Sequence, residues 1–510
     1  MPDTTPEQPD NEIGAIPVLR LSVLSDRPSK VEGEFVVYWM TAARRTRWNF
    51  AIQRAVGWAR ELKRPLVIFE ILSAGGRWDS DRHHSFVLQG MKENAQQLAN
   101  APALYYPYVE PQAGECRRLF ESVCSRACVV VTDDYPIPLP SVRTVDAELP
   151  VRVEKIDGNG LLPLKAADSA FPTAYAFRRF LQRSLREHLL DTPKSDPFAR
   201  VELPRLKSLP TEIGRRWPAA AARLLSCEPT ALAKLPIDHD VPAVKMVGGP
   251  TAAHARWKRF VETKLASYSE LRNQPEFETT SGLAPYLHVG HISVHEIFQG
   301  LARQEGWSPG RLAEKATGSR EGWWGMSAAA EAFLDQLVTW REVGFNFCAY
   351  RSDYDDYQSL PPWAKATLSK HTADNRAQLY SLDQFTAAAT HDQLWNAAQR
   401  QLMAEGHIHN YLRMLWGKKI LEWTASPQEA LEIIIELNNR YALDGQDPNS
   451  YSGIFWILGR YDRPWGPERP IFGTVRYMSS ENTARKVRVK DYVQCYSGET
   501  AGFAKDLRGN

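Results

Sequence analysis

Three tryptophans in the C-terminal half have a spacing that suits electron hopping. Trp416 and Trp423 are seven residues apart in one helical pattern. We therefore expect them on one helix face, two turns and about 10 Å of rise apart. Trp395 lies in the preceding helical segment, and three indoles converging on a redox cofactor would form a relay to solvent. On spacing alone, an ordinary set of core tryptophans explains them equally well.

A polar residue, Asn438, interrupts an otherwise apolar helix face. Residues 426–429 offer a Ser N-cap, a Pro at the first helical position and a Glu at the third. This capping box predicts a helix that begins at Pro427. Along it Leu431, Ile435 and Asn438 fall on one face. A buried amide needs hydrogen-bond partners, and backbone carbonyls of the core are the simplest ones.

Motifs of other chemistries are missing or incomplete. The sequence has no GxSxG, HExxH or GxxxxGK[ST] motif, which disfavours hydrolases and NTPases. Two histidine pairs have metal-ligand spacing but no completing carboxylate or cysteine, at 288 and 291 and at 407 and 409. The cysteines at 116, 124 and 128 are irregularly spaced. We predict no metal site and no disulfide framework.

The elements that must position these residues begin with an α/β pattern. Short apolar runs at 35–39, 66–69 and 128–131 alternate with helical stretches at 48–62 and 86–98. Because the runs are continuous, both faces of each strand are buried, which predicts a Rossmann-like parallel sheet covered by helices. No GxGxxG follows the first strand, so the dinucleotide fingerprint is missing.

Long helical patterns dominate the second half of the chain. They lie at 252–271, 293–305, 328–343, 382–405, 411–423 and 427–441. We expect four units along the chain: a flexible tail at 1–16, an α/β domain at 17–160, a connector at 161–242 and an all-α domain at 243–510.

Bulk composition restricts the class of protein. A chain of 510 residues with 43% hydrophobic and 24% charged residues is typical of a globular protein with more than one core. We find no run of about 20 apolar residues and no signal peptide, which predicts a cytoplasmic protein without membrane contact. A net charge of +2 means that any nucleic-acid contact must be local. Basic residues that could supply such a contact, although each more commonly has the role of a solvated surface charge, are Arg413, Lys418, Lys419, Arg460 and Arg463.

Seven segments between residues 333 and 485 carry a family likeness. They read TWRE at 339–342, NFC at 346–348, LWNAAQ at 394–399, YLRMLW at 411–416, KKILEWT at 418–424, LDGQDPN at 443–449 and ERPIFG at 468–473. They closely resemble the FAD-binding domain of class II cyclobutane pyrimidine dimer photolyases, in the photolyase/cryptochrome family. TSGLAPYLH at 280–288 resembles the family's loop for the flavin diphosphate, and VVYWM at 36–40 more weakly resembles its antenna-pigment domain.

The resemblance implies a U-shaped FAD in the helical domain. Small residues and exposed N–H groups ahead of a helix suit a diphosphate. Asn438 would face the reactive flavin edge, where an amide can donate or accept as the redox state changes. Trp395, Trp416 and Trp423 match the family's photoreduction relay. The other implied FAD contacts are Tyr268, Thr280, Ser281, Gly282, Leu283, Ala284, Arg341, Asp444 and Asp447.

The resemblance also implies UV-damaged DNA as the partner. A pocket for a flipped pyrimidine dimer would be lined by flat and polarizable side chains, namely Trp340, Met414, Trp456 and Trp465. One departure stands out: this chain has Gln336, with Asp335 beside it, where the family has a dimer-binding glutamate. Glutamine can donate a hydrogen bond but cannot supply a proton.

Three functions are compatible with this sequence. The first is light-driven splitting of pyrimidine dimers by reduced FAD, and the second is a cryptochrome-like blue-light receptor, which Gln336 favours. A light-independent flavin enzyme is the third, but the matched pocket lacks a catalytic base. An antenna pigment of deazaflavin or folate type remains open, and we expect a monomer. Residues 304–326 are expected to be an insertion, and 457–465 a shortened, more basic segment.

Overall fold

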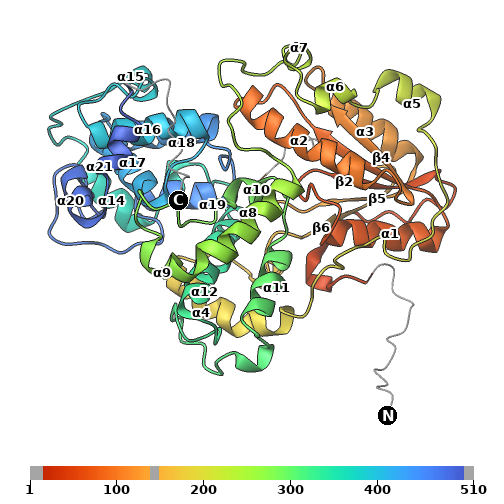
Figure 1. Ribbon diagram of the computed structural model, residues 1–510, viewed down its shortest axis with the longest axis horizontal. Helices are drawn as coiled ribbons and strands as arrows, with labels where there is room; N and C mark the ends of the chain where they lie inside the picture. The colour runs from red at the N-terminus through yellow and green to blue at the C-terminus, as the bar shows by residue number, and fades with distance from the viewer. Residues whose placement is uncertain (1–14, 138–148, 499–510) are drawn as a thin grey trace.

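The computed structural model describes residues 15–137 and 149–498. The expected tail lies almost wholly outside the described residues. An α/β part and a helical part lie side by side (Figure 1). The fold class predicted from the sequence is therefore confirmed.

Within the described ranges, six strands form one sheet in the order β1-β6-β5-β2-β3-β4. All neighbouring pairs are parallel except β1 with β6, which is antiparallel and differs from the all-parallel expectation. Strands β2, β3 and β5 are buried along their whole length, as continuous apolar runs predict. The strands are β1 (Leu21–Ser25), β2 (Phe35–Met40), β3 (Leu66–Leu72), β4 (Ala103–Val109), β5 (Ala127–Asp133) and β6 (Arg152–Ile156).

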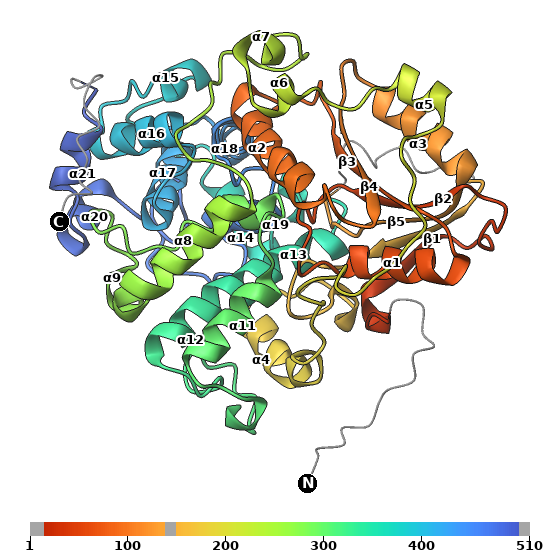
Figure 2. The same cartoon turned by 45° about the vertical axis from the view of Figure 1, so that its right-hand side comes forward.

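Alternating side chains of β2 pack on opposite faces of the sheet. Val36, Tyr38 and Met40 join the cluster of helix α1 (Phe50–Leu62), whereas the intervening residues join that of α3 (Glu115–Arg126). The third long helix of this part, α2 (Asp81–Gln97), faces the helical part and contacts α8 (Figure 2).

Short helices follow the α/β part. They are α4 (Ala174–Ser184), α5 (Thr211–Arg216), α6 (Ala222–Leu225) and α7 (Pro229–Leu232), and they lie in the segment expected to be a connector. Helix α5 and the α6–α7 segment pack back onto the α/β part. Helix α4 instead packs in the core of the helical part.

The helical part is built from many helices of moderate length. They are α8 (Pro250–Thr263), α9 (Tyr268–Leu271), α10 (Ala284–His288), α11 (Val294–Gln304), α12 (Ala328–Leu334), α13 (Arg341–Tyr350), α14 (Pro362–Lys370), α15 (Leu382–Thr386), α16 (Gln393–Glu405), α17 (Asn410–Glu422), α18 (Pro427–Tyr441), α19 (Pro448–Ile457), α20 (Ser480–Lys486) and α21 (Lys490–Cys495). Three expected helices are interrupted. A 3-10 turn, Leu265–Ser267, separates α8 from α9 within the expected helix at 252–271. A π-helical stretch, Asp335–Trp340, separates α12 from α13, and a loop separates α15 from α16.

Helix α18 begins at Pro427 as predicted, but its cap is arranged differently. The Ser426 hydroxyl accepts a hydrogen bond from the N–H of Glu429 at 3.1 Å. The Glu429 carboxylate accepts from the N–H of Ala425 at 2.8 Å, one residue before the N-cap that a capping box would use. The N-cap is therefore confirmed, and the reciprocal half of the box is displaced by one residue.

One arginine of the α/β part binds the ends of two helices of the helical part. The buried Arg82 of α2 donates to the carbonyl of Tyr441 at 2.6 Å, at the end of α18. It also donates to the carbonyls of Leu402 and Met403, in the last turn of α16, at 3.1 and 2.5 Å. Unpaired carbonyls at a helix C-terminus are favourable partners for a cation.

Candidate active site

The structure brings the three relay tryptophans together, with Trp395 in the middle. Trp395 and Trp416 stack almost in parallel, with ring centroids 6.4 Å apart and planes at 5°. Trp423 meets Trp395 edge-on, with centroids 6.0 Å apart. Trp423 follows the last residue of α17, where the helix has ended. Trp395, from α16, lies between Trp416 and Trp423 and contacts both rings.

The outer end of this row reaches towards the surface through two residues that the sequence did not single out. Tyr380 and the exposed His391 both lie against Trp423, with ring centroids 5.6 and 5.0 Å away. The Tyr380 hydroxyl and Nδ1 of His391 are 2.7 Å apart. Their only sequence signal is proximity to Trp395, because the loop that carries His391 immediately precedes α16.

Asn438 is buried, and its amide partners are side chains rather than the backbone carbonyls of a core amide. Its Nδ2 donates to the Ser450 hydroxyl at 2.8 Å and to Oδ1 of Asn439 at 3.1 Å. In the described part of the chain Oδ1 of Asn438 accepts no hydrogen bond. This leaves an acceptor available for a ligand, as the flavin assignment requires.

The loop at 280–284 has the form of an anion site. Within the described residues the backbone N–H groups of Thr280, Ser281 and Gly282 donate no hydrogen bond. Gly282 has φ +62°, and a Cβ there would collide with the guanidinium of Arg256, a residue that sequence reasoning missed. Leu283 is buried and precedes α10, which begins at Ala284. Free N–H groups beside an arginine fit a flavin diphosphate.

Tyr268 lies apart from that loop in an aromatic cluster. Its ring centroid is 5.5 Å from that of Phe260 and 5.8 Å from that of Phe333. Burial raises the pKa of Tyr268 above its ordinary value, so the phenol stays protonated. Its assignment to the flavin remains a prediction.

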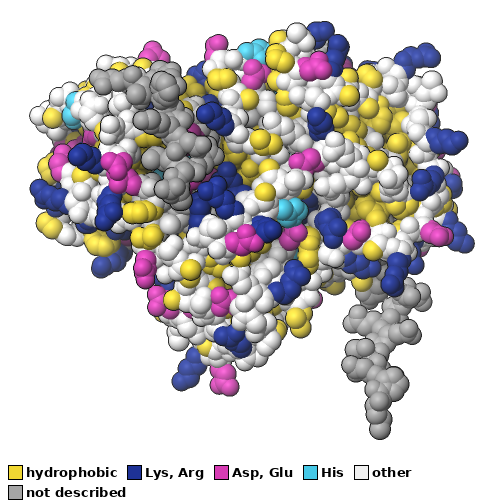
Figure 3. Space-filling view, viewed as in Figure 1, with side chains coloured by type: hydrophobic (Ala, Val, Ile, Leu, Met, Phe, Trp, Pro, Cys, Tyr) yellow, Lys and Arg dark blue, Asp and Glu magenta, His cyan; other side chains and the backbone are white. Residues whose placement is uncertain are grey.

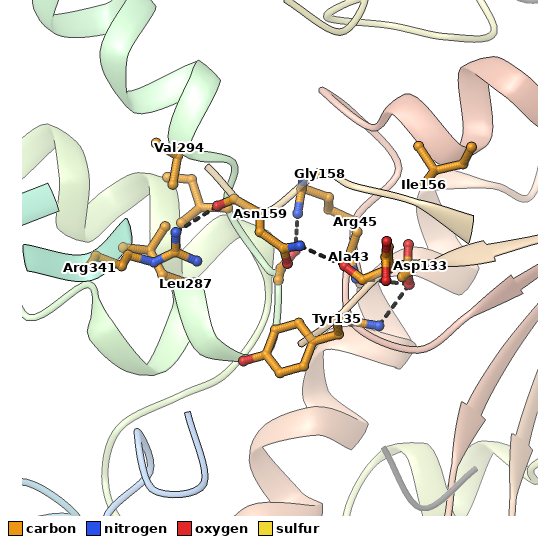
Figure 4. Close-up of a pocket in the computed structure, with 14 residues that line it drawn as sticks. Ala43, Arg45, Asp133, Tyr135, Ile156, Gly158, Asn159, Leu287, Val294 and Arg341 are labelled. Atoms are coloured by element: carbon orange, nitrogen blue, oxygen red, sulfur yellow. Dashed lines mark hydrogen bonds between the residues drawn. The ribbon is translucent and has the colours of Figure 1, made fainter. Parts of the chain in front are cut away.

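Two of the expected flavin residues lie where the helical part meets the α/β part. Arg341 donates to the carbonyl of Asn159 at 2.6 Å (Figure 4). The buried Asp447 accepts from the Tyr135 hydroxyl at 3.0 Å and lies 3.3 Å from Nδ1 of His288. Burial alone would raise the pKa of Asp447, but His288 and Arg341 outweigh it and hold that pKa below its ordinary value.

The third expected carboxylate, Asp444, is already paired. Arg413 binds it with two parallel hydrogen bonds of 3.1 and 2.9 Å. Bidentate pairs of this kind fix the orientation of both groups. A direct contact of Asp444 with flavin remains a prediction, and Arg413 is a positioning residue that the sequence assigned to the DNA surface.

The expected lesion residues are all partly exposed, and one arginine links two of them. Trp340, Met414 and Trp456 are half-buried, and Trp465 is 38% exposed. The exposed Arg476 lies between two of them, with its guanidinium carbon 5.6 Å from the Trp456 ring centroid and 5.0 Å from that of Trp465. Cation–π contacts of this kind hold aromatic side chains at a surface.

Gln336 is half-buried in the π-helical stretch, four residues before Trp340. Its neighbour Asp335 does not take over the role of the missing glutamate. Nε of Arg178, from α4, donates to Asp335 at 2.8 Å, and both side chains are buried. The amide of Gln336 is therefore the group at this position that can contact a lesion.

Lys418 was expected at the surface but is fully buried. Its ammonium nitrogen lies 5.2 Å from the ring centroid of Trp456 and donates to the carbonyl of Ile457. Burial lowers the pKa of Lys418 to about 7. The next residue, Lys419, lies 5.3 Å from the ring centroid of Trp423 and pairs with Glu422 at 2.9 Å.

The crevice where an antenna pigment would bind is filled. In α/β sheets this is the carboxyl end of the strands at which connections diverge, here β2 and β5. The N–H groups of residues 41–43 all donate to Asp133, at 2.7 to 3.1 Å. Arg45 and Asn159 occupy the rest, and the cavity left is about 20 Å³, room for a single water (Figure 4). As the side chains stand, this crevice does not fit a pigment.

The described residues contain neither a helix that could span a membrane nor a cluster of metal-ligating side chains. No helix in the described ranges combines the length and the apolar character needed to cross a bilayer. No three histidine, cysteine or acidic side chains in those ranges gather in a way that could hold a metal ion.

Comparison with known proteins defines the class. A class III photolyase structure from Agrobacterium tumefaciens superposes with a TM-score of 0.65 at 17% identity, covering 93% of this chain and 88% of that one. The fold is therefore that of photolyases. A deoxyribodipyrimidine photo-lyase of Methanothermobacter thermautotrophicus is 30% identical over 491 residues, 94% of this chain and 98% of its own length. The chain belongs to the deoxyribodipyrimidine photo-lyase family.

Plant relatives agree with this assignment. The deoxyribodipyrimidine photo-lyase of Oryza sativa subsp. japonica is 32% identical over 497 residues, covering 92% of this chain and 88% of that protein. No family model matches the sequence. The family resemblance drawn from the sequence is confirmed, whereas the class II assignment remains a prediction.

Proposed function

We propose that this protein is a light-dependent DNA repair enzyme, a carbon–carbon lyase that splits cyclobutane pyrimidine dimers in UV-damaged DNA. Membership of the deoxyribodipyrimidine photo-lyase family supports the reaction. The observation that carries the electron-transfer mechanism is the contiguous row Trp416, Trp395 and Trp423, whose neighbouring ring centroids are 6.4 and 6.0 Å apart.

Bound FAD would supply light absorption and the electron that opens the dimer. The free N–H groups of residues 280–282, with Arg256, would hold its diphosphate. Asn438 would present its free Oδ1 to the ring, and Ser450 fixes that orientation. Arg341 and Asp447 would complete the pocket from the domain junction.

The tryptophan row would carry electrons to the oxidised flavin and so return it to the reduced form. Trp395 and Trp416 are 0% and 1% exposed, so a dissolved reductant cannot reach the inner end of the row directly. Trp423, Tyr380 and His391 continue the row outward, with the exposed His391 at its end. An external reductant would meet the protein at this outer end.

The lesion would enter through the partly exposed tryptophans. Trp340, Met414, Trp456 and Trp465 would pack on the two flipped bases, and unstacking is least costly for a lesion that is already poorly stacked. Lys and Arg side chains gather near the middle of the face drawn in Figure 3, between α10 and α19. Such local positive charge can bind DNA phosphates although the whole chain is nearly neutral.

A second candidate function is a cryptochrome-like blue-light receptor, and Gln336 favours it. Without an ionisable group at this position, and with Asp335 held by Arg178, proton-assisted stabilisation of the dimer would be weakened. The tryptophan row would serve a receptor equally well.

The two functions are separated by illuminating the flavin-loaded protein with an oligonucleotide that carries one dimer, under reducing conditions. Loss of the lesion supports repair. Persistence of the lesion while the flavin still photoreduces would refute it and support the receptor.

Replacing Gln336 by Glu tests the role of this residue. We expect the repair yield per absorbed photon to rise several-fold, since the carboxyl can both bond and protonate the dimer. Gln358→Glu, on a surface turn, is the matched control. An unchanged yield would show that residue 336 does not limit repair.

A further inference from the structure

The inner two tryptophans of the row donate their indole N–H groups to oxygens that are very weak bases. Nε1 of Trp416 donates to Oε1 of Gln399 at 2.9 Å. Nε1 of Trp395 donates to the backbone carbonyl of Trp416 at 3.0 Å. Gln399 is 0% exposed, and Trp395 lies one turn before it on α16. The amide therefore sits beside the stacked pair and shields it from water.

The orientation of this amide is fixed by chemistry. An indole nitrogen is only a donor, so the carbonyl oxygen of Gln399 must face Trp416. Its Nε2 has no hydrogen-bond partner in the described structure. A buried unpaired N–H group is destabilising, which indicates that the contact with Trp416 is retained for another reason.

The outer tryptophan has different neighbours. Trp423 contacts His391, an exposed imidazole whose ring carries a basic nitrogen. The ammonium group of Lys419 also lies over its ring. A positive charge at this place favours loss of a proton from an oxidised indole. Basic acceptors are thus found at the outer end of the row, and amide oxygens at the inner end.

We propose that Gln399 is a positioning residue that keeps Trp416 protonated while it is oxidised, so that the charge moves outward instead of being trapped. The proposal rests on the proposed function. Trp416 would give one electron to a bound, light-excited flavin and would regain one from Trp395, which in turn would regain one from Trp423. The N–H proton would leave only at Trp423, to solvent, and a thiol reductant would later return one electron and one proton to that residue.

Two variants of Gln399 separate hydrogen bonding from basicity. Gln399→Glu keeps the shape but adds a group that can take the proton once it is ionised. Gln399→Leu removes the acceptor without adding a base. Gln393→Glu, at an exposed position of the same helix, is the matched control. Flavin content and circular dichroism establish that each variant is folded and loaded.

Time-resolved absorption after a light flash distinguishes the indole cation radical from the neutral radical. In the Gln399→Glu variant we expect early neutral radical and a several-fold lower yield of stable charge separation. The effect should grow with pH, because burial raises the pKa of the introduced carboxyl. The parent protein and Gln393→Glu should form the cation radical first. Gln399→Leu should also form it, but in lower yield, because the charged indole loses the acceptor that stabilises it. A Gln399→Glu variant that behaves like the parent at every pH overturns the proposal.

A measurement in the dark tests the contact itself. In the ¹⁵N spectrum of the flavin-loaded protein, the indole N–H resonance of Trp416 should shift in Gln399→Leu and stay in Gln393→Glu. An unshifted resonance would show that the hydrogen bond is absent and overturn the inference. If the parent protein with chemically reduced flavin removes no dimer under light, the proposed function fails instead, and the two failures are therefore distinguishable.

Discussion

Two groups of tryptophan in the helical part differ in almost every respect except residue type. The relay group, Trp395, Trp416 and Trp423, is 0 to 3% exposed, and its rings contact one another. In the lesion group, Trp456 and Trp465 are partly exposed and are held through the guanidinium of Arg476. The comparison teaches that an indole's role follows from its surroundings: dry ring-to-ring contact suits electron transfer, and an open face beside a cation suits binding of a base.

The largest expected effect breaks the relay group at its centre. Trp395 is the ring that contacts both of the others, so Trp395→Phe should abolish light-driven reduction of the oxidised flavin. Repair by chemically pre-reduced enzyme should be largely unchanged, because that electron does not use the row. Flavin absorbance under continuous light and lesion loss measure the two separately. Equal loss of both activities would contradict the relay assignment.

The converse substitution tests the lesion group. Trp465→Ala should weaken binding of dimer-containing DNA by about 1–3 kcal/mol, the usual contribution of one aromatic stacked on a base. Photoreduction should stay at the parent rate, since the row is untouched. Fluorescence titration with damaged and undamaged oligonucleotides measures the affinity, with Trp363→Ala, outside both groups, as the control. An equal loss of affinity for both oligonucleotides would show that Trp465 does not bind the lesion.

The smallest expected effect concerns two adjacent lysines. Lys418 lies against Trp456 of the lesion group, and Lys419 lies against Trp423 of the relay group. Burial lowers the pKa of Lys418 to about 7, below its value in the unfolded chain. Between these two values the unfolded state binds more protons, so the folded state gains stability as pH rises. Relative to Lys418→Met, the parent protein should gain up to about 1.4 kcal/mol per pH unit above pH 7.

Urea denaturation at several pH values measures this slope. Lys419→Met is the matched control, because the pKa of Lys419 is raised mainly through Glu422, against the opposing effect of burial. A parent protein whose stability does not change relative to Lys418→Met would show that this lysine is not buried as described.

Apolar periodicity located many of the longer helices, and an explicit start signal fixed the beginning of one of them. Helix α18 begins at Pro427 behind its Ser N-cap and ends at Tyr441. Residues 382–405 were wrongly predicted as one helix, because the helical period of their apolar residues runs through the whole stretch. A second helix in fact begins after Asp392, whose side chain accepts a hydrogen bond from the N–H of Trp395. Strand β4 was missed because it contains Pro107, which an edge strand tolerates.

The candidate site was less predictable, because it depends on contacts between distant segments. Family motifs located Trp395, Trp416 and Trp423, but helical spacing could not place Trp395 between the other two. The contacts of Gln399 and Lys418 with tryptophans depend on how α16, α17 and α19 pack. Charge alone suggested that Lys418 is solvated, and only the packing of these helices makes it buried.

The contacts of Arg82 give the α/β part a role that needs no pigment. This single guanidinium ties the last turns of α16 and α18, the helices that carry Trp395 and Asn438. The α/β part therefore helps to hold the relative positions of the two helices that carry Trp395 and Asn438. Without the sheet and its helix α2, the last turns of α16 and α18 would lose this shared partner.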